Sequence, residues 1–262
     1  MTIGRGDRIV VVETESGDRH LLSADGGGAR KESGLGIVNP DPWVGLPWGS
    51  RVSCAGKACV LLPVRLPDLA LTLRRKAQII LPKDASRIVF ELGVGEGDRV
   101  LESGIGSGGA TVALAWAVGA SGRVVVQELR EDFAAWGREN LERAGLGNRI
   151  EVHLGDLTVG LAPPVKGPFQ ACLLDQPEPW RALPHILAAL APGARLAAYC
   201  PQVVQVESMV RGLREADFLD VRALELIERG WEVKERGSRP SFDGLGHTGF
   251  LVFAQWPGSG TP

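Results

Sequence analysis

The residues best suited to holding a ligand form a glycine-rich segment near the middle of the chain, Glu102-Ser103-Gly104-Ile105-Gly106-Ser107-Gly108-Gly109. The segment follows a short apolar run that ends at Leu101, and it leads into a helical pattern that begins near Ala110. Glycines let the backbone approach a bound group closely, and the free amides at a helix start favour a polar or anionic group. The segment therefore predicts a nucleotide-like ligand, although close packing of a helix on a strand would need the same glycines.

Two acidic residues follow the next two predicted strands. Glu128 lies twenty residues after Gly108, where a carboxylate can accept hydrogen bonds from both hydroxyls of an adenosine ribose. Asp156 follows the third strand, where it could accept a hydrogen bond from an adenine amino group or, alternatively, cap the following turn. These two acids fit a nicotinamide dinucleotide as well as any other adenosine-containing ligand.

A third acid opens a stiff loop after the fourth strand, Asp175-Gln176-Pro177-Glu178-Pro179-Trp180. A carboxylate at the carboxyl end of a parallel strand lies beside the ligand crevice of such a sheet. The two prolines restrict the loop, so we expect Asp175 and Trp180 to be presented to a ligand. The alternative is that Asp175 caps the next helix and Trp180 belongs to the core.

From Ala85 onward the chain has the pattern of alternating strands and helices that could position these residues. Apolar runs alternate with amphipathic segments of helix length, and the runs are 99–101, 123–126, 150–152, 171–174 and 194–199. Apolar strands that alternate with helices predict a parallel sheet covered on both faces. Two last strand candidates, 218–227 and 248–256, have no comparable helix between them and are expected to pair antiparallel.

The N-terminal part of the chain has a different pattern. Residues 8–12 and 20–22 flank a turn in a hairpin pattern, and no helical period occurs before about residue 66. A chain of 262 residues is long enough for two domains. We therefore predict a small β-domain at 1–65, a connector at 66–84 and a ligand-binding domain at 85–262.

Composition narrows the class of protein. Apolar residues make up 44% and charged residues 23%, which is ordinary for a globular protein. No apolar run approaches a membrane span and the N-terminus lacks a signal-peptide core, so a cytoplasmic protein is expected. The spacing of the four cysteines indicates neither a metal site nor a disulfide framework.

Charge is unevenly distributed along the chain. The net charge of −2 excludes a generally basic nucleic-acid binder, but six cations and two anions between Arg65 and Arg87 give a local excess of +4. The alternative to a binding face is a solvated helix and loop.

Four motifs, taken together in this order, resemble one enzyme family. They are Leu81-Pro82-Lys83-Asp84-Ala85, Glu-Ser-Gly-x-Gly-Ser-Gly at 102–108, Asp-x-Pro-Glu-Pro-Trp at 175–180, and Gly-His-Thr-Gly-Phe-Leu at 246–251. Over about residues 66 to 256 the chain resembles the bacterial and archaeal tRNA adenine-58 N1-methyltransferases. The Pro-Lys-Asp-Ala and Gly-His-Thr elements are far more specific than the glycine turn, which all class I methyltransferases share.

The resemblance implies a Rossmann-like seven-stranded class I methyltransferase sheet, an α/β fold, with a small N-terminal β-domain, assembled as a homotetramer that grips tRNA. It implies S-adenosylmethionine as cofactor and no metal. Its methionine part would be held by Glu102, Ser103, Gly104, Gly106, Ser107, Gly108 and Gly109. By the same resemblance Glu128 would bind the ribose, Asp156 the adenine, and Asp175 would be the catalytic acid. The family often has an aromatic residue to seat the target adenine where this chain has Leu81, which cannot stack in the same way.

Methylation at N1 of an adenine buried in folded tRNA requires the base to be drawn out of its stack. Trp180 is a candidate wall for that base, and His247 is a candidate base or, preferably, a structural residue. Asp175 would stabilise the positive charge on the adenine, so we expect it to be ionised and hydrogen-bonded. The candidate phosphate ligands are Arg74, Arg75, Lys76, Lys83, Arg236 and Arg239, which would make tRNA affinity fall steeply with salt.

Three other functions remain as alternatives. A nicotinamide dehydrogenase would need a histidine or tyrosine for proton transfer, and the only tyrosine is Tyr199. A methyltransferase acting on a small molecule or a protein carboxyl would not need the Asp-x-Pro-Glu-Pro-Trp and Gly-His-Thr elements. A non-catalytic tRNA-binding subunit should have lost the glycine turn and Asp175, and this chain retains both. The sequence leaves open whether adenine-57 is also modified.

Overall fold

The computed structural model describes residues 1–76, 78–244 and 246–258. It divides into two compact units, Met1–Arg74 and Arg75–Pro262. Helix α1 (Leu66–Thr72) belongs to the first unit and helix α2 (Pro82–Leu92) to the second, so the predicted connector contributes helical residues to both.

The first unit is built on a four-stranded antiparallel sheet in the order β2-β1-β6-β5. Alternate side chains of its strands, including Ile9, Val11 and Leu61, form a core closed by Trp43. The elements before α1 are β1 (Arg8–Glu13), β2 (Arg19–Ser23), β3 (Arg30–Glu32), β4 (Gly36–Val38), the 3₁₀ turn η1 (Asp41–Trp43), β5 (Arg51–Cys54) and β6 (Lys57–Pro63). The small β-domain expected from the hairpin patterns is present.

The second unit contains a seven-stranded sheet in the order β12-β15-β11-β10-β7-β8-β9. Its strands are β7 (Arg99–Ser103), β8 (Arg123–Glu128), β9 (Ile150–Leu154), β10 (Phe169–Leu174), β11 (Leu190–Cys200), β12 (Leu219–Glu225) and β15 (Phe250–Gln255). The strands from β7 to β11 are parallel, and β15 runs antiparallel between β11 and β12, which confirms the predicted last pair.

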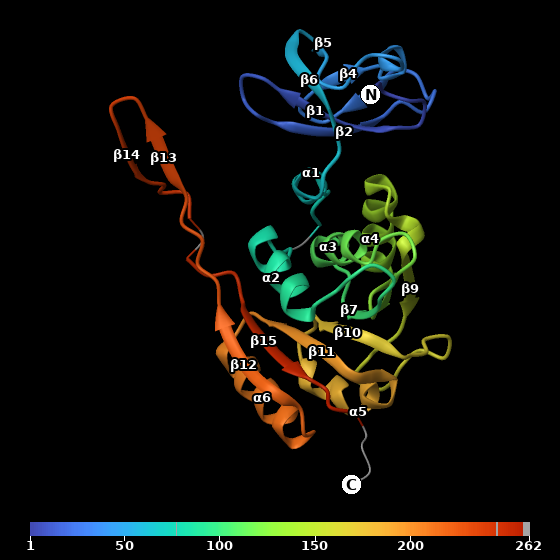
Figure 1. Cartoon of the computed structure of the whole chain (residues 1–262), viewed down its shortest axis with the longest axis vertical. Coiled ribbons are helices and arrows are strands. Elements are labelled where there is room, and N and C mark those ends of the chain that lie inside the picture. Colours follow the sequence, from blue (N-terminus) through green and yellow to red (C-terminus); the bar gives the residue numbers. More distant parts are fainter. Residues whose placement is uncertain (77, 245, 259–262) are drawn as a thin grey trace. The chain divides into compact units, whose positions relative to one another are not determined.

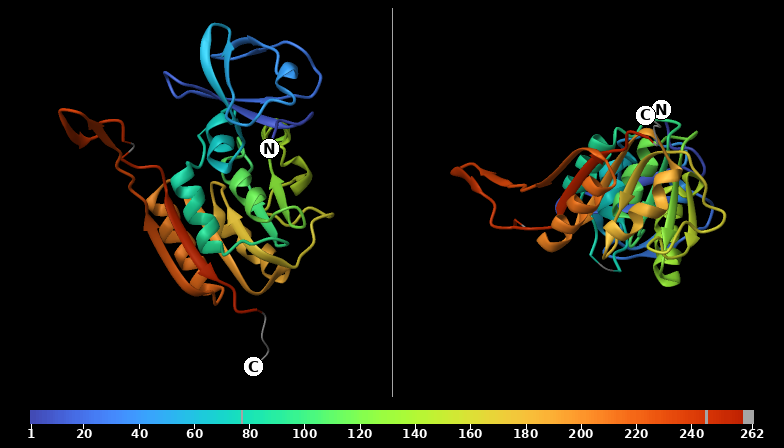
Figure 2. Two further views of the ribbon diagram at one scale, coloured as in Figure 1. Left: turned by 45° about the horizontal axis from the view of Figure 1, so that its top comes forward. Right: turned by 90° about the horizontal axis from the view of Figure 1, so that it is seen from below.

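Helices cover both faces of this sheet (Figures 1 and 2). Besides α2 they are α3 (Gly109–Ala117), α4 (Glu131–Ala144), the 3₁₀ turn η2 (Gly147–Arg149), α5 (Leu183–Ile186) between the 3₁₀ turns η3 (Pro179–Ala182) and η4 (Leu187–Ala189), and α6 (Val203–Glu215). The main core packs α5 and α6 against alternate residues of β7, β10 and β11, such as Leu101, Leu174 and Leu196. The strands are buried on both faces because their side chains are apolar on both, as the pattern predicted.

Two local features differ from the sequence expectations. The segment 180–190, one of those with apolar residues at helical spacing, is divided into η3, α5 and η4 rather than forming one helix, because Pro184 has no amide hydrogen for a bond back to the Trp180 carbonyl. The segment between β12 and β15 contains a hairpin, β13 (Trp231–Lys234) and β14 (Gly237–Pro240), that extends away from the sheet (Figure 1). In β13 apolar and charged residues alternate over only four positions, Trp231 to Lys234, and β14 is polar, so the pattern is too short to mark a hairpin.

Within the described residues, no helix is both long and apolar enough to cross a membrane.

Candidate active site

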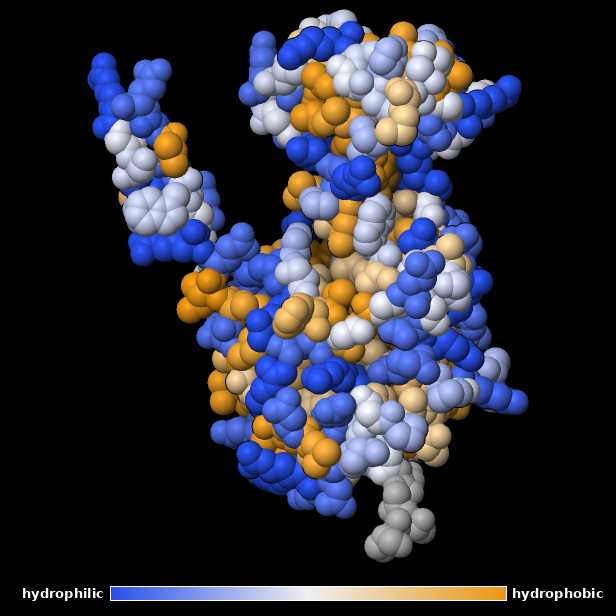
Figure 3. All heavy atoms as spheres, viewed as in Figure 1, coloured by the Kyte–Doolittle hydropathy of each residue, from blue (hydrophilic) through white to orange (hydrophobic). Residues whose placement is uncertain are grey.

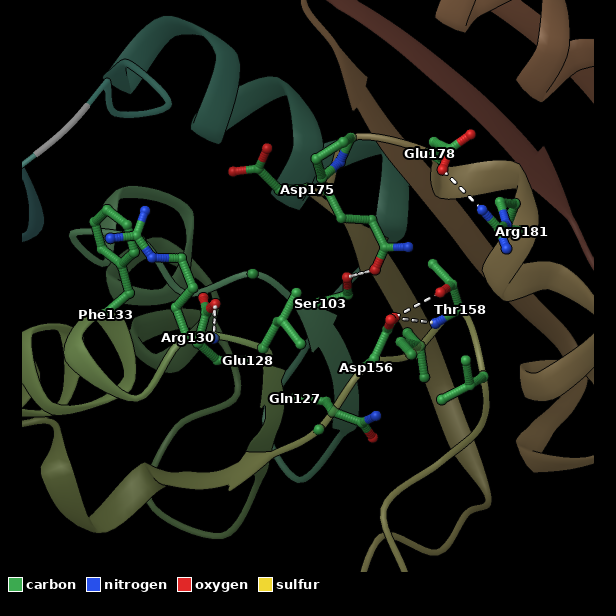
Figure 4. Close-up of a pocket in the computed structure, with 18 residues that line it drawn as sticks. Ser103, Gln127, Glu128, Arg130, Phe133, Asp156, Thr158, Asp175, Glu178 and Arg181 are labelled. Atoms are coloured by element: carbon green, nitrogen blue, oxygen red, sulfur yellow. Dashed lines mark hydrogen bonds and ion pairs between the residues drawn. The ribbon is translucent and has the colours of Figure 1, made fainter.

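Four parallel strands of the second unit end around one cavity of about 500 Å³ (Figure 4). Its lining comes from the residues that follow β7, β8, β9 and β10, and it includes Gly104, Glu128, Asp156 and Asp175. The carboxyl ends of parallel strands leave such a crevice where neighbouring connections run to opposite faces of the sheet. The strand pattern therefore brings together the acids that the sequence separates by up to 47 positions between Glu128 and Asp175.

The glycine turn passes between β8 and β10 at the floor of the cavity. The Gly104 amide donates to the Gln127 carbonyl at 3.1 Å, and the Asp175 amide donates to the Ser103 carbonyl at 2.9 Å. Gly104 has a φ of +84°, and a side chain there would overlap the Asp175 carbonyl. Only glycine lets the three strand ends approach this closely.

The second half of the turn supports the start of α3 rather than lining the cavity. The Ser107 hydroxyl accepts the Lys76 amide at 3.0 Å, and the Ser107 carbonyl accepts Asn140 Nδ2 at 2.9 Å. A side chain at Gly109 would overlap Ile79, so the segment 78–80 packs directly on the helix start. Of the glycine-turn residues predicted to bind the cofactor, Ser103, Gly104 and Gly106 line the cavity, whereas Glu102, Ser107, Gly108 and Gly109 do not.

Glu128 is held in one orientation by the backbone around it. Its two carboxylate oxygens accept the Ile105 amide at 3.0 Å and the Arg130 amide at 2.9 Å. The side chain is only 7% exposed, and it faces the cavity. A buried carboxylate fixed by two amides retains lone pairs for a ligand's hydroxyl groups.

Asp156 uses one oxygen in a turn and lines the cavity as well. Its Oδ1 accepts the Thr158 amide at 2.8 Å and the Thr158 hydroxyl at 2.7 Å. Hydrogen bonds from the Thr158 hydroxyl and amide hold the pKa of Asp156 below its ordinary value. Oδ1 therefore caps the turn, as the alternative expected. Within the described chain nothing hydrogen-bonds to Oδ2, so this oxygen is left for a ligand.

Asp175 is in a different electrostatic state from the one expected. Its side chain is half-buried, and within the described residues no donor hydrogen-bonds to its carboxyl group. Burial, with a contribution from Glu128, raises the pKa of Asp175 to about 7. The prediction of a hydrogen-bonded carboxylate was therefore wrong for the described part of the chain, where no cation forms an ion pair with Asp175.

The cavity also contains residues that the sequence patterns did not single out. The Ser103 hydroxyl donates to Gln176 Oε1, and Gln176 Nε2 is buried without a partner in the described chain. The Arg130 guanidinium lies 4.2 Å from the centre of the Phe133 ring. Gln176 occupies the variable position of the strand-four motif, which gave no signal, and Arg130 and Phe133 belong to an amphipathic helix start that resembles any other.

Comparisons with known proteins decide the family. The family model described as "tRNA methyltransferase complex GCD14 subunit" matches residues 59–238. The chain belongs to this tRNA methyltransferase family.

Individual relatives agree with the family model. A tRNA (adenine(58)-N(1))-methyltransferase of Thermus thermophilus is 38% identical over 195 residues, which is 74% of this chain and 76% of that protein. A tRNA (adenine(57)-N(1)/adenine(58)-N(1))-methyltransferase of Methanocaldococcus jannaschii is 31% identical over 225 residues, covering 77% and 80%.

Solved structures resemble the whole chain. The tRNA (m1A58) methyltransferase of Aquifex aeolicus has a TM-score of 0.74 and 26% identity, and the match covers 97% of this chain and 98% of that one. A protein of Thermotoga maritima, described as an S-adenosylmethionine-dependent O-methyltransferase, has a TM-score of 0.83 and 30% identity, covering 100% and 97%. The fold is the Rossmann-like class I methyltransferase fold, and the methyl donor of this tRNA methyltransferase family is S-adenosylmethionine.

The site of this methyltransferase fits a positively charged cofactor. Glu102 is 1% exposed, and its Oε1 accepts the Thr111 hydroxyl at 3.0 Å. Its Oε2 is buried and has no hydrogen-bond partner in the described chain. Burial raises the pKa of Glu102 well above its ordinary value. Because the charges of Glu128 and Asp175 also oppose ionisation of Glu102, and that of Glu128 opposes ionisation of Asp175, a ligand that brings an ammonium and a sulfonium group would stabilise Glu102 and Asp175 as carboxylates.

Two of the predicted substrate residues are corrected by the structure. Trp180 does not line this cavity. It packs against the core and against Gly212 of α6 beside a separate hollow, as the alternative expected. Lys83 donates to three acceptors, Asp84 Oδ1 at 2.8 Å, the Leu226 carbonyl at 2.8 Å and Thr248 Oγ1 at 2.7 Å. An ammonium has three donors, so Lys83 has none left for a phosphate.

The remaining predicted phosphate ligands all lie at exposed positions, and they are Arg74, Arg75, Lys76, Arg236 and Arg239. Lys76 pairs with Asp132 at 2.7 Å, and Arg239 pairs with Glu232 at 2.8 Å. The last two therefore hold existing partners that a phosphate would have to displace.

His247 and Leu81 both lie outside the cavity lining. His247 Nδ1 lies 2.6 Å from Glu225 Oε1, and Nε2 lies 3.1 Å from the Pro201 carbonyl. Both partners are acceptors, and the bond to Glu225 raises the pKa of His247. Neither ring nitrogen is thus free to act as a base. Leu81 is half-buried at the N-cap of α2.

Proposed function

We propose that this protein transfers the methyl group of S-adenosylmethionine to N1 of adenine-58 in tRNA. The observation that carries the proposal is the cavity in which Asp175, Glu128 and Asp156 face one space at the ends of three parallel strands. The relatives of known name supply the acceptor, since those of Thermus and Methanocaldococcus are both named for N1 of adenine-58. The Methanocaldococcus name adds adenine-57, which product mapping would test in this protein.

The roles of the residues follow from their chemistry. S-adenosylmethionine supplies an electrophilic methyl group when bound. Glu128 would accept hydrogen bonds from the cofactor's ribose hydroxyls, and Asp156 would accept one from its adenine amino group. Glu102, which lies outside the cavity lining of the free protein, is proposed to accept hydrogen bonds from the cofactor's ammonium through its buried, unpartnered oxygen. Gln176 Nε2 is an additional buried donor in the same space.

Asp175 would act on the acceptor adenine. Attack by the in-plane lone pair of N1 spreads positive charge over N1, C6 and N6, and a carboxylate near N6 stabilises that charge or accepts the proton. The positive charge of a bound cofactor would lower the pKa of Asp175 from about 7 and so favour its ionised form. Most of the acceleration comes from alignment of nitrogen, carbon and sulfur.

One experiment tests the class of reaction. The protein is incubated with labelled S-adenosylmethionine and unmodified tRNA, and the nucleosides are then separated. We expect label in N1-methyladenosine and no label in tRNA whose adenine-58 is replaced by guanosine. The O-methyltransferase description of the Thermotoga protein suggests the competing function, for which label would enter a small hydroxyl acceptor and not tRNA.

The oligomer and the location belong to the same proposal. We propose a homotetramer in the cytoplasm. The β13–β14 hairpin supports association, because an isolated two-stranded hairpin is marginal in water and this one exposes Trp231 and Val233 by 62% and 80%. Hydrophobic side chains interrupt the hydrophilic surface of this hairpin in Figure 3. Sedimentation or light scattering would measure the assembly.

Arg74 and Arg75 are proposed to contact tRNA phosphates. Replacing both with glutamine should weaken tRNA binding and reduce the slope of log affinity against log salt by about 1 to 2, because each phosphate contact releases condensed counterions. Fluorescence anisotropy at several salt concentrations measures the slope. Lys166→Gln with Arg214→Gln removes the same charge from exposed positions elsewhere and should leave the slope unchanged. An equal slope for both double variants would assign Arg74 and Arg75 to a solvated face.

A further inference from the structure

Two sequence motifs outside the cavity meet in one buried cluster. The motifs are Pro82-Lys83-Asp84-Ala85 and Gly246-His247-Thr248. Besides the bond from Lys83, Thr248 donates its hydroxyl to Asp84 Oδ2 at 2.8 Å. Lys83 also pairs with Asp84 Oδ1, so the ammonium, the carboxylate and the hydroxyl form a closed triangle. We call Lys83, Asp84 and Thr248 the polar clamp.

The clamp is built as an internal connection rather than a binding surface. The side chain of Asp84 is 0% exposed and that of Lys83 is 12% exposed. Every donor of Lys83 and both oxygens of Asp84 have partners. A buried ion pair contributes most when its remaining hydrogen bonds are satisfied, and it then fixes one arrangement of the elements that supply it.

The elements that the clamp joins are the two ends of the hairpin-bearing segment. Leu226, whose carbonyl accepts from Lys83, directly follows β12, and Thr248 lies two residues before β15. Between them lies the segment with β13 and β14, which we call the hairpin arm (Figure 1). The bond between Glu225 and His247 crosses the same base, so both ends of the arm are tied to each other and to the N-terminus of α2.

The clamp also reaches the strand beside the catalytic acid. The Tyr199 hydroxyl donates to the Thr248 carbonyl, and a side chain at Gly249 would overlap the Tyr199 ring. Tyr199 lies on β11, one residue beyond Ala198, which pairs with Leu174 of β10. Asp175 follows Leu174 directly, so one chain of contacts runs from the arm's base to the carboxyl end of β10.

We propose that Lys83 is a positioning residue: through the polar clamp it fixes the hairpin arm relative to Asp175, so that tRNA meets both in a single geometry. The proposal rests on the proposed function, since it assigns the arm, which carries the predicted phosphate ligands Arg236 and Arg239, to the tRNA side of that reaction as well as to association. It replaces the phosphate role predicted for Lys83. A substrate held by a loosely attached arm would spend less time aligned for transfer, with no change at the cofactor site.

The test compares Lys83→Met, Thr248→Val and the double variant with wild type. Thr248→Val keeps the Lys83–Asp84 pair intact, so it remains informative if Lys83→Met destabilises the fold, which circular dichroism will report. Lys166→Met, at an exposed position, is the control for loss of one positive charge. Amide hydrogen exchange of the hairpin arm, KM for tRNA, kcat, the affinity for S-adenosylmethionine and the salt dependence of tRNA binding are measured for each.

The clamp predicts the same signature for both single variants. Exchange in the arm should rise by about tenfold, since a hydrogen bond to a charged group is lost, and kcat/KM for tRNA should fall by about as much. Cofactor affinity and the salt slope should stay at wild-type values, and the double variant should be little worse than either single variant. A phosphate role for Lys83 would instead lower the salt slope by about 1 in Lys83→Met alone, with arm exchange unchanged.

Failure of the clamp and failure of the proposed function give different results. Hydrogen exchange needs no substrate, so an unprotected arm in wild type, or unchanged protection in both single variants, overturns the clamp whatever reaction the enzyme catalyses. If wild type transfers no methyl group to tRNA while the arm loosens as expected, the clamp survives as a structural device and the tRNA role of the arm is overturned.

Discussion

Asp175→Asn lowers kcat for methyl transfer to tRNA by about a thousandfold, while the affinity for S-adenosylmethionine stays within about threefold of wild type. The expectation follows because asparagine retains the shape of the side chain and loses the charge that would stabilise the methylated adenine. Single-turnover transfer measures the chemical step, and calorimetric titration measures cofactor binding. Glu207→Gln, at an exposed position of α6 outside the cavity lining, is the control for loss of one negative charge and should retain most of the activity.

The stability of this variant at different pH values provides a second, independent check on Asp175. A carboxyl group with a pKa of about 7 in the folded protein, against an ordinary value of 3.8, binds its proton more tightly when folded than when unfolded. The free energy of unfolding therefore falls as pH rises through this interval. Asp175→Asn removes the penalty and should raise the free energy of unfolding at pH 8 by about 1 to 3 kcal/mol without cofactor.

Wild-type activity should also depend on the ionisation of Asp175, but it should rise with pH where the stability falls. kcat/KM should rise with pH and level off above about 7, because the ionised form of Asp175 is the active one in the free enzyme. An Asp175→Asn protein that is less stable than wild type at pH 8, or that transfers methyl groups at the wild-type rate, would contradict the assignment of Asp175.

The sequence predicted the part of the site that depends on chain order. A glycine turn after one strand and an acid after each of the next three can be located by counting, because parallel strands with intervening helices place all of these ends at one edge. Glu128, Asp156 and Asp175 are therefore brought together by topology alone. The hydrophobic pattern alone predicts which strand each acid follows and at which edge of the sheet it lies.

What the sequence left unresolved depends on contacts across the fold. The Lys83 ammonium finds its acceptors 143 and 165 positions away, at Leu226 and Thr248, and a cation in a charged stretch carries no mark of such a burial. The raised pKa of Asp175 likewise arises from burial around the cavity and not from its neighbours in the chain. Trp180 was misplaced because a tryptophan two residues after Glu178 can face either side of the loop, and α6 provides the apolar surface that decides.

Gly104→Ala should abolish cofactor binding and lower the free energy of unfolding by about 3 kcal/mol or more, a larger loss than at any other position of the glycine turn that lines the cavity. A methyl group at this position would overlap the Asp175 carbonyl, and backbone atoms of β7 and β10 can give way only by separating the two strands. The φ of +84° adds the cost of a left-handed conformation. Thermal unfolding and cofactor titration measure the two effects.

Gly106→Ala is the control that separates the overlap from the backbone conformation. Gly106 also lines the cavity and has a positive φ of +50°, but a methyl group there would meet no atom within 4 Å. This variant should lose only about 1 kcal/mol of stability and should remain folded at 25 °C. The difference between the two alanine variants therefore measures how closely the glycine turn must approach the strand that carries Asp175. Equal stability losses would mean that the left-handed conformation alone explains the glycines and that the approach of β7 to the Asp175 carbonyl does not constrain position 104.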